Sequence, residues 1–159
     1  MRRLVALLCC LCCAGPSGAD VRPFQPGSLR QIEAEHAGRP FILALWSATC
    51  THCPGELKAL GELVRRHKKL AIVLVATDTP DDAPALARLA ADHGLDGQPQ
   101  WVFADPQAER LRYEIDPRWT GELPRTYFFD SKHRRTGRSG IIPPADLARW
   151  VQEHDAGKF

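Results

Sequence analysis

Two cysteines separated by two residues are the part of the chain best suited to chemistry: Cys50-Thr51-His52-Cys53. They follow the apolar run 41–46 by a short turn and precede a stretch with helical spacing of leucines. Backbone N–H groups and the positive dipole end at a helix N-terminus stabilise a thiolate. We therefore expect Cys50 to be the exposed attacking thiol. Cys53, one helical turn on, is expected to be the buried thiol that resolves a mixed disulfide.

His52 lies between the two cysteines. A protonated imidazole beside Cys50 would stabilise the thiolate and so make the pair more oxidising. The alternative is a solvated loop histidine without a chemical role. A structural zinc site would need two further ligands, and the chain has neither a second cysteine pair beyond the leader nor two histidines at zinc-finger spacing. A purely structural disulfide would close too short a loop to stabilise much. We predict no metal.

The first nineteen residues have the pattern of a secretory signal. Arg2 and Arg3 precede an apolar run over 4–14, and Ser17 and Ala19 supply the small residues of a cleavage site before Asp20. The run is short for a membrane span, which needs about 20 residues. We predict a signal peptide over 1–19 and a periplasmic protein, with an uncleaved anchor as the alternative. Four of the six cysteines leave with this segment.

Removing the signal also changes the charge. Without Arg2 and Arg3, the 21 basic residues fall to the number of acidic ones, 19. A neutral composition gives no bias toward nucleic acid or anionic lipid.

The remaining chain reads as an extended lead-in over 20–27 and one domain over 28–159. Ser28 and Gln31 suggest a capping box that starts the first helix. Apolar runs of strand length and helical spacings then alternate, which is typical of parallel βα units, and a hairpin and a closing helix follow. The class is α/β with a mixed sheet. We expect strands over 41–46, 70–75, 101–103, 126–129 and 139–142.

Two segments resemble the thioredoxin family. Residues 46–54, Trp-Ser-Ala-Thr-Cys-Thr-His-Cys-Pro, resemble its first signature, and residues 121–130 resemble the second, in which a cis-proline precedes a strand and faces the cysteines. The resemblance implies a thioredoxin fold with helices flanking a mixed central sheet. It also implies a cis bond at Leu123–Pro124 and a substrate groove shaped by Pro124, Leu123 and Trp46. The redox-active disulfide would be the only redox group, with no cofactor.

A narrower resemblance is to the exported TlpA/ResA-like branch. That branch often carries a glutamate three residues after the second cysteine, here Glu56, and an insertion between the second βα unit and the cis-proline strand, here 81–116. The resemblance implies a monomeric reductase of protein disulfides. Supplying reductant in cytochrome c maturation is one role of the family. Its partners would be protein thiol or disulfide substrates and an upstream membrane redox partner. Glu56 would move protons.

Some residues depart from that branch. Thr49 stands where an aromatic residue is common, and Ala44 stands where cytoplasmic thioredoxins have a buried aspartate. A histidine before the second cysteine is more similar to the oxidase DsbA or to protein disulfide isomerase. A disulfide oxidant or isomerase therefore stays open. So do a Cu(I) carrier, because copper(I) prefers soft sulfur ligands, and a binding module with vestigial chemistry.

Overall fold

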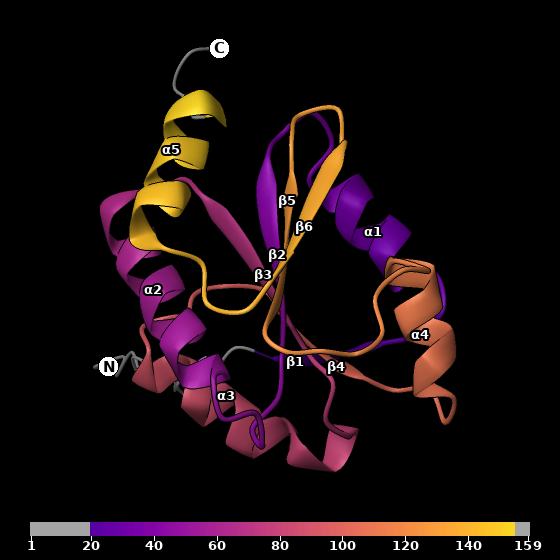
Figure 1. The fold of residues 1–159 in the computed structure, drawn as a ribbon. Coiled ribbons are helices and arrows are strands. Elements are labelled where there is room, and N and C mark those ends of the chain that lie inside the picture. The colour runs from indigo at the N-terminus through magenta and orange to yellow at the C-terminus, as the bar shows by residue number, and fades with distance from the viewer. Residues whose placement is uncertain (1–19, 155–159) are drawn as a thin grey trace, which may run out of the picture.

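The structure is a computed structural model that describes residues 20–154. The predicted signal peptide, 1–19, lies outside the described residues. The core of the fold is a six-stranded sheet with the order β1-β4-β3-β2-β5-β6 (Figure 1). Its strands are β1 Val21–Phe24, β2 Phe41–Trp46, β3 Ala71–Ala76, β4 Gln100–Phe103, β5 Arg125–Phe129 and β6 Arg135–Ser139.

Strands β1 to β4 pair in parallel, whereas β5 pairs antiparallel with both β2 and β6. The α/β class with a mixed sheet is therefore confirmed. The insertion predicted over 81–116 supplies two helices and β4, which lies between β3 and β1 in the sheet.

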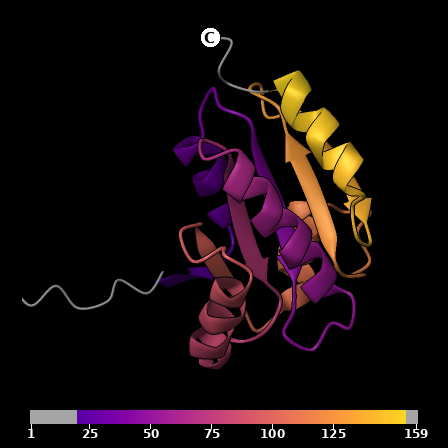
Figure 2. The ribbon, with the colours of Figure 1, turned by 90° about the vertical axis from the view of Figure 1, so that its left-hand side faces the viewer.

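Helices cover both faces of the sheet (Figures 1 and 2). Helices α2 Cys53–Arg66, α3 Ala83–Asp92 and α5 Pro144–His154 pack on one face, and α1 Ser28–Glu35 and α4 Ala108–Ile115 on the other. A short 3-10 turn, Pro80–Asp82, leads into α3. Every residue of β2 is buried, because successive side chains enter opposite cores. This central strand fixes the position of the turn that holds Cys50.

The extended lead-in 20–27 contains a strand, β1, because pairing with β4 gives its backbone partners despite Pro23. Two predictions of local structure were wrong. The second hairpin strand is Arg135–Ser139 rather than 139–142. The Asp130 carboxylate accepts the N–H groups of Lys132 and Arg134, which closes the hairpin turn early.

The capping box at Ser28 was also wrong. Gly27 is the N-cap of α1, and its φ of 92° lies in the left-handed region that favours glycine. Ser28 is the first helical residue, and its hydroxyl accepts the N–H of Gln25 instead of capping the helix.

Candidate active site

Cys50 and Cys53 form a disulfide, with their Cα atoms 5.4 Å apart. Cys50 lies in the turn after β2, and Cys53 is the first residue of α2, where Pro54 fits the first turn. The Cys53 N–H donates a hydrogen bond to Cys50 Sγ at 3.2 Å. A helix-end donor therefore already points at the sulfur atom that would carry a thiolate after reduction.

The two sulfur-bearing residues differ in burial. Cys53 is 0% exposed and belongs to the core cluster between α2 and the sheet. Cys50 is partly exposed and packs at the edge of the same cluster. An incoming reagent therefore reaches Cys50 and not Cys53.

His52 is exposed and is the N-cap residue of α2, although its side chain makes no capping hydrogen bond. The imidazole is thus free to face solvent or a bound substrate. Across the described residues, no group of three or more His, Cys, Asp or Glu side chains is arranged to hold a metal ion.

Glu56 lies one helical turn after Cys53 and is 1% exposed. Its Oε1 accepts the Thr126 hydroxyl at 2.9 Å, and its Oε2 accepts the Ile142 N–H at 2.8 Å. Burial raises the pKa of this carboxyl above its ordinary value, and the two hydrogen bonds only partly oppose that rise. Residues three apart on a helix share a face, so Glu56 lies near Cys53 with a carboxyl suited to accepting and returning a proton.

Asp78 follows β3 and holds the turn in front of Cys50. Its Oδ1 accepts the Ser47 hydroxyl at 3.0 Å, and its two oxygens accept the Ala48 N–H at 3.2 and 3.3 Å. The Ser47 hydroxyl in turn accepts the Thr49 N–H at 3.1 Å. One carboxylate therefore orders the segment that carries the sulfur.

The peptide bond between Leu123 and Pro124 is cis, as predicted. Leu123 is partly buried and packs against the same core cluster as Cys50. Arg125, the next residue, reaches Asp116 at 3.4 Å and Glu122 at 3.5 Å, which ties the start of β5 to the preceding loop.

Trp46 does not line a surface groove. It is 3% exposed and lies in the core cluster that contains Cys53, so it can support a groove only from beneath. An exposed apolar side chain is instead supplied by Ile141, which is 49% exposed. The Ile141 side chain packs against the first turn of α2 at Gly55. A Cβ added to Gly55 would lie 2.7 Å from Ile141 Cδ1, which is too close. Gly55 thus leaves room for an apolar residue beside the disulfide.

Sequence reasoning missed three residues that build this site: Asp78, Thr126 and Ile142. Asp78 had a usable signal, because the carboxyl ends of neighbouring parallel strands meet at one edge of a sheet. Nothing in the sequence pattern indicated that Thr126 and the Ile142 N–H would meet Glu56, since both contacts are set by the packing of the hairpin and α5 against α2.

The mixed six-stranded sheet and the Cys-X-X-Cys disulfide at the start of α2 together define a thioredoxin-like fold. The family model of the AhpC/TSA family matches residues 23–134, and the chain belongs to that family. No curated protein sequence matches it significantly.

Several solved structures share the thioredoxin fold. MTB DsbF is 22% identical with a TM-score of 0.60, over 82% of this chain and 86% of its own. A secreted Mycobacterium tuberculosis disulfide oxidoreductase homologous to E. coli DsbE is 19% identical with a TM-score of 0.60, over 76% and 85%. A thiol:disulfide interchange protein of the thioredoxin family from Chlorobium tepidum TLS is 20% identical with a TM-score of 0.61, over 77% and 83%. The predicted thioredoxin fold is confirmed.

Proposed function

We propose that this protein is an exported reductase of protein disulfides in which Cys50 attacks and Cys53 resolves. The observation that carries the proposal is the contrast between the two cysteines: Cys50 is accessible and receives a helix-end N–H, whereas Cys53 is fully buried. Among residues 20–154, no helix is long and apolar enough to cross a membrane. The periplasmic location rests on the leader sequence, and a secreted protein is among the structures that share the fold.

In the proposed reaction, the Cys50 thiolate attacks one sulfur of a substrate disulfide. A mixed disulfide forms, and the other substrate sulfur leaves as a thiolate. The Cys53 thiol then gives its proton to the Glu56 carboxylate and attacks Cys50 Sγ. The Cys50–Cys53 disulfide forms, and the second substrate sulfur leaves and is protonated. Two electrons pass from the protein to the substrate, and a membrane redox partner would restore the dithiol.

Substrate contact is proposed for the surface around Cys50. The exposed Ile141, which packs beside Gly55 on the first turn of α2, would offer an apolar group to an extended chain, and the backbone at the cis Leu123–Pro124 bond is proposed to line the same groove. Cytochrome c maturation, in which a protein dithiol must be kept reduced for haem attachment, is one role that such a reductase would fit.

Trapping of mixed disulfides tests the roles of the two cysteines. We expect Cys53→Ser to accumulate mixed disulfides with a model disulfide protein, because attack survives and resolution does not. Cys50→Ser should form none and lose exchange, with a loss of at least about 100-fold in rate. Non-reducing gels and mass spectrometry read out the adducts. Adducts that form at Cys53 in Cys50→Ser at the wild-type rate would reverse the assignment.

One observation favours a second candidate, a disulfide oxidant or isomerase. His52 is exposed beside the disulfide, where a protonated ring would stabilise the reduced form. The reduction potential separates the candidates. A reductase should lie toward the value of thioredoxin, about −270 mV, and an oxidant toward that of DsbA, about −120 mV. A Cu(I) carrier would instead bind copper tightly through the same two sulfurs and show little exchange.

A further inference from the structure

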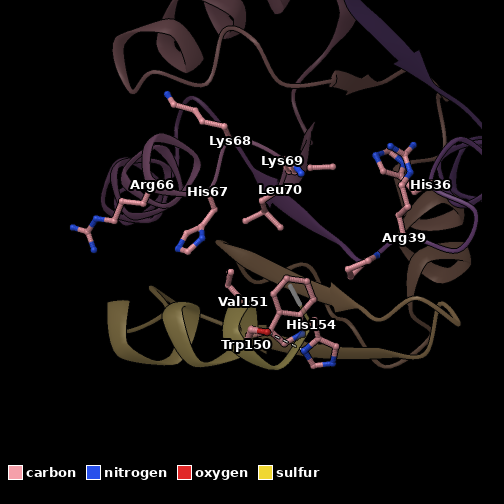
Figure 3. Close-up of a pocket in the computed structure, with 12 residues that line it drawn as sticks. His36, Arg39, Arg66, His67, Lys68, Lys69, Leu70, Trp150, Val151 and His154 are labelled. Carbon is pink, nitrogen blue, oxygen red and sulfur yellow. Dashed lines mark hydrogen bonds between the residues drawn. The ribbon is translucent and has the colours of Figure 1, made fainter. Parts of the chain in front are cut away.

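A cavity of about 240 Å³ lies at the other end of the sheet from the disulfide. It is formed by the loop after α1, the loop between α2 and β3, and the last turn of α5 (Figure 3). Pro40, which lines it, directly precedes β2, whereas the disulfide follows the far end of that strand. At about 3.3 Å per residue, the six residues of β2 separate the two sites by about 20 Å.

The charged side chains that line this cavity, within the described part of the chain, are all positive. Of its twelve lining residues, four are Arg or Lys, three are His, five are apolar and none is acidic. Leu70, Val151 and Trp150 form an apolar interior, with His67 on one side of Leu70 and Arg39 reaching in from the other (Figure 3). The side chains of Arg66 and Lys68 extend away from the interior.

Helix ends account for only some of these basic residues. The Arg39 Nη2 group donates to the Glu35 carbonyl at 2.8 Å, and the Nδ1 atoms of His36 and His154 lie 2.9 Å from carbonyls in their own last turns. Cations near helix C-termini are favourable for this reason. A backbone carbonyl is neutral, however, and does not cancel the charge of Arg39.

Other basic residues of the cavity have no such explanation. The side chains of His67 and Lys69 make no hydrogen bond or ion pair within residues 20–154, and Arg66 has only Glu62, at 3.9 Å. Arg and Lys side chains around an apolar interior, with no acidic group among the described lining residues, favour an anion that carries an apolar body. A cation would meet like charge, and an uncharged apolar ligand would cover cationic groups without giving them a partner.

We propose that this cavity binds a small amphipathic anion, with a carboxylate or phosphate head near Arg39 and Lys69 and an alkyl chain against Leu70, Trp150 and Val151. The cavity volume is smaller than that of pockets for drug-sized ligands, which begin at about 300 Å³. The ligand is therefore either a small molecule or a larger one that inserts a single alkyl chain. The head can belong to a free anion or to an anionic lipid. This site is additional to the proposed reductase function and does not depend on the cysteines.

Titration with sodium octanoate, followed by amide and indole NMR shifts, tests the proposal. We expect saturable shifts at Leu70 and at the Trp150 indole N–H, and none around Cys50. The double variant Arg39→Gln with Lys69→Gln should bind at least tenfold more weakly, about 1.4 kcal/mol. Lys69→Gln alone removes no contact made within the described residues and should weaken binding in the same direction.

Arg88→Gln is the matched control, because Arg88 is exposed on α3 and lies outside the cavity. It should bind octanoate as the wild type does. Octanamide, which has the same chain without the charge, and acetate, which has the head without the chain, should each bind at least tenfold more weakly than octanoate.

Vesicles distinguish the two sources of the head group. Octanoate binding together with binding to phosphatidylglycerol vesicles, but not to phosphatidylcholine vesicles, would assign a lipid, and octanoate binding alone would assign a free anion. The proposal is overturned if octanoate gives no saturable shift, if octanamide binds equally well, or if Arg88→Gln weakens binding as much as the double variant. Vesicle binding without octanoate binding would also overturn it, because it would indicate a basic surface and not a pocket.

Discussion

Cys50 and Cys53 are two residues apart, yet a reagent meets them in very different environments. Cys50 Sγ receives the Cys53 N–H and is partly exposed, whereas Cys53 has no exposed surface. The N–H bond favours negative charge on Cys50, and a sulfur enclosed by apolar side chains disfavours charge. The order of attack in the proposed reaction therefore follows from the turn that precedes α2 and from the burial of its first residue.

His52→Ala tests whether the exposed imidazole affects the direction of electron flow. We expect the reduction potential of the Cys50–Cys53 couple to fall, because the variant loses a group that favours the reduced state. An exposed charge is screened and worth about 1 kcal/mol or less, so the fall should be about 20 mV or less. Equilibration with glutathione buffers measures it, and Thr51→Ala is the matched control. An unchanged potential in His52→Ala would remove the reason for the oxidant candidate.

Glu56 joins three elements: its carboxylate on α2 accepts hydrogen bonds from Thr126 in β5 and from the Ile142 N–H in the loop before α5. The same carboxyl that is proposed to move a proton therefore also holds the strand after the cis-proline against the helix of the disulfide. Its two roles can be separated, because Gln keeps the shape and can donate to the Thr126 hydroxyl while accepting the Ile142 N–H, but cannot take up a proton.

Glu56→Gln should stabilise the oxidised protein at neutral pH. The pKa of Glu56 is raised above its ordinary value of 4.5, so the folded state holds the proton more tightly than the unfolded state. Ionisation therefore costs stability as pH rises from 4.5 through the raised value. Urea unfolding should show a gain in the free energy of unfolding at pH 7 that shrinks toward pH 4. A gain of equal size at both pH values would contradict a raised pKa.

The same substitution should slow resolution of the mixed disulfide. Loss of a proton acceptor near Cys53 removes general base catalysis, and we expect resolution to be at least tenfold slower. Stopped-flow release of substrate thiol from a preformed adduct measures this step. The reduction potential should move little, and a slow variant with an unchanged potential would separate proton transfer from redox poise.

Asp78→Ala should loosen the turn that carries Cys50. The substitution leaves the Ser47 hydroxyl and the Ala48 N–H without their acceptor. Loss of these bonds should lower the free energy of unfolding by about 1–2 kcal/mol and slow alkylation of reduced Cys50 severalfold. Asp81→Ala is the control, because Asp81 is exposed and its side chain makes no hydrogen bond within residues 20–154. Equal effects of the two substitutions would contradict a positioning role for Asp78.

Local patterns predicted the elements that carry the cysteines. The apolar run 41–46 is β2, and the leucines after Cys53 form the buried face of α2. The polar strand β6 was missed because, as an edge strand with exposed side chains, it needs no apolar alternation, and the apolar pair Ile141-Ile142 drew the prediction past its end. Contacts such as Glu56 with Thr126 join residues 70 positions apart, so no local pattern reports them.

At the scale of the whole molecule, charge composition was a poor guide to charge distribution. The chain without its leader has equal numbers of acidic and basic residues, which suggested no anionic partner. The fold nevertheless brings the loop after α1, the loop after α2 and the end of α5 together, and their basic residues line one cavity that has no acid among residues 20–154. The proposed reductase site and the proposed anion site thus occupy opposite ends of the parallel strands.

We predict that the whole chain is exported and that its leader is cleaved after Ala19. The predicted cleavage site follows Ala19, and β1 begins at Val21 and pairs with β4 along its full length. Cleavage there would remove the leader and its four cysteines while leaving the sheet intact. Expression of the whole chain in a Gram-negative host should give a periplasmic protein whose intact mass corresponds to a start at Asp20. Ala19→Arg should block processing, because signal peptidase needs a small residue at that position. Recovery of wild-type protein that still begins at Met1 and sediments with membranes would instead establish the uncleaved anchor, and it would place the disulfide of Cys50 and Cys53 at the membrane surface.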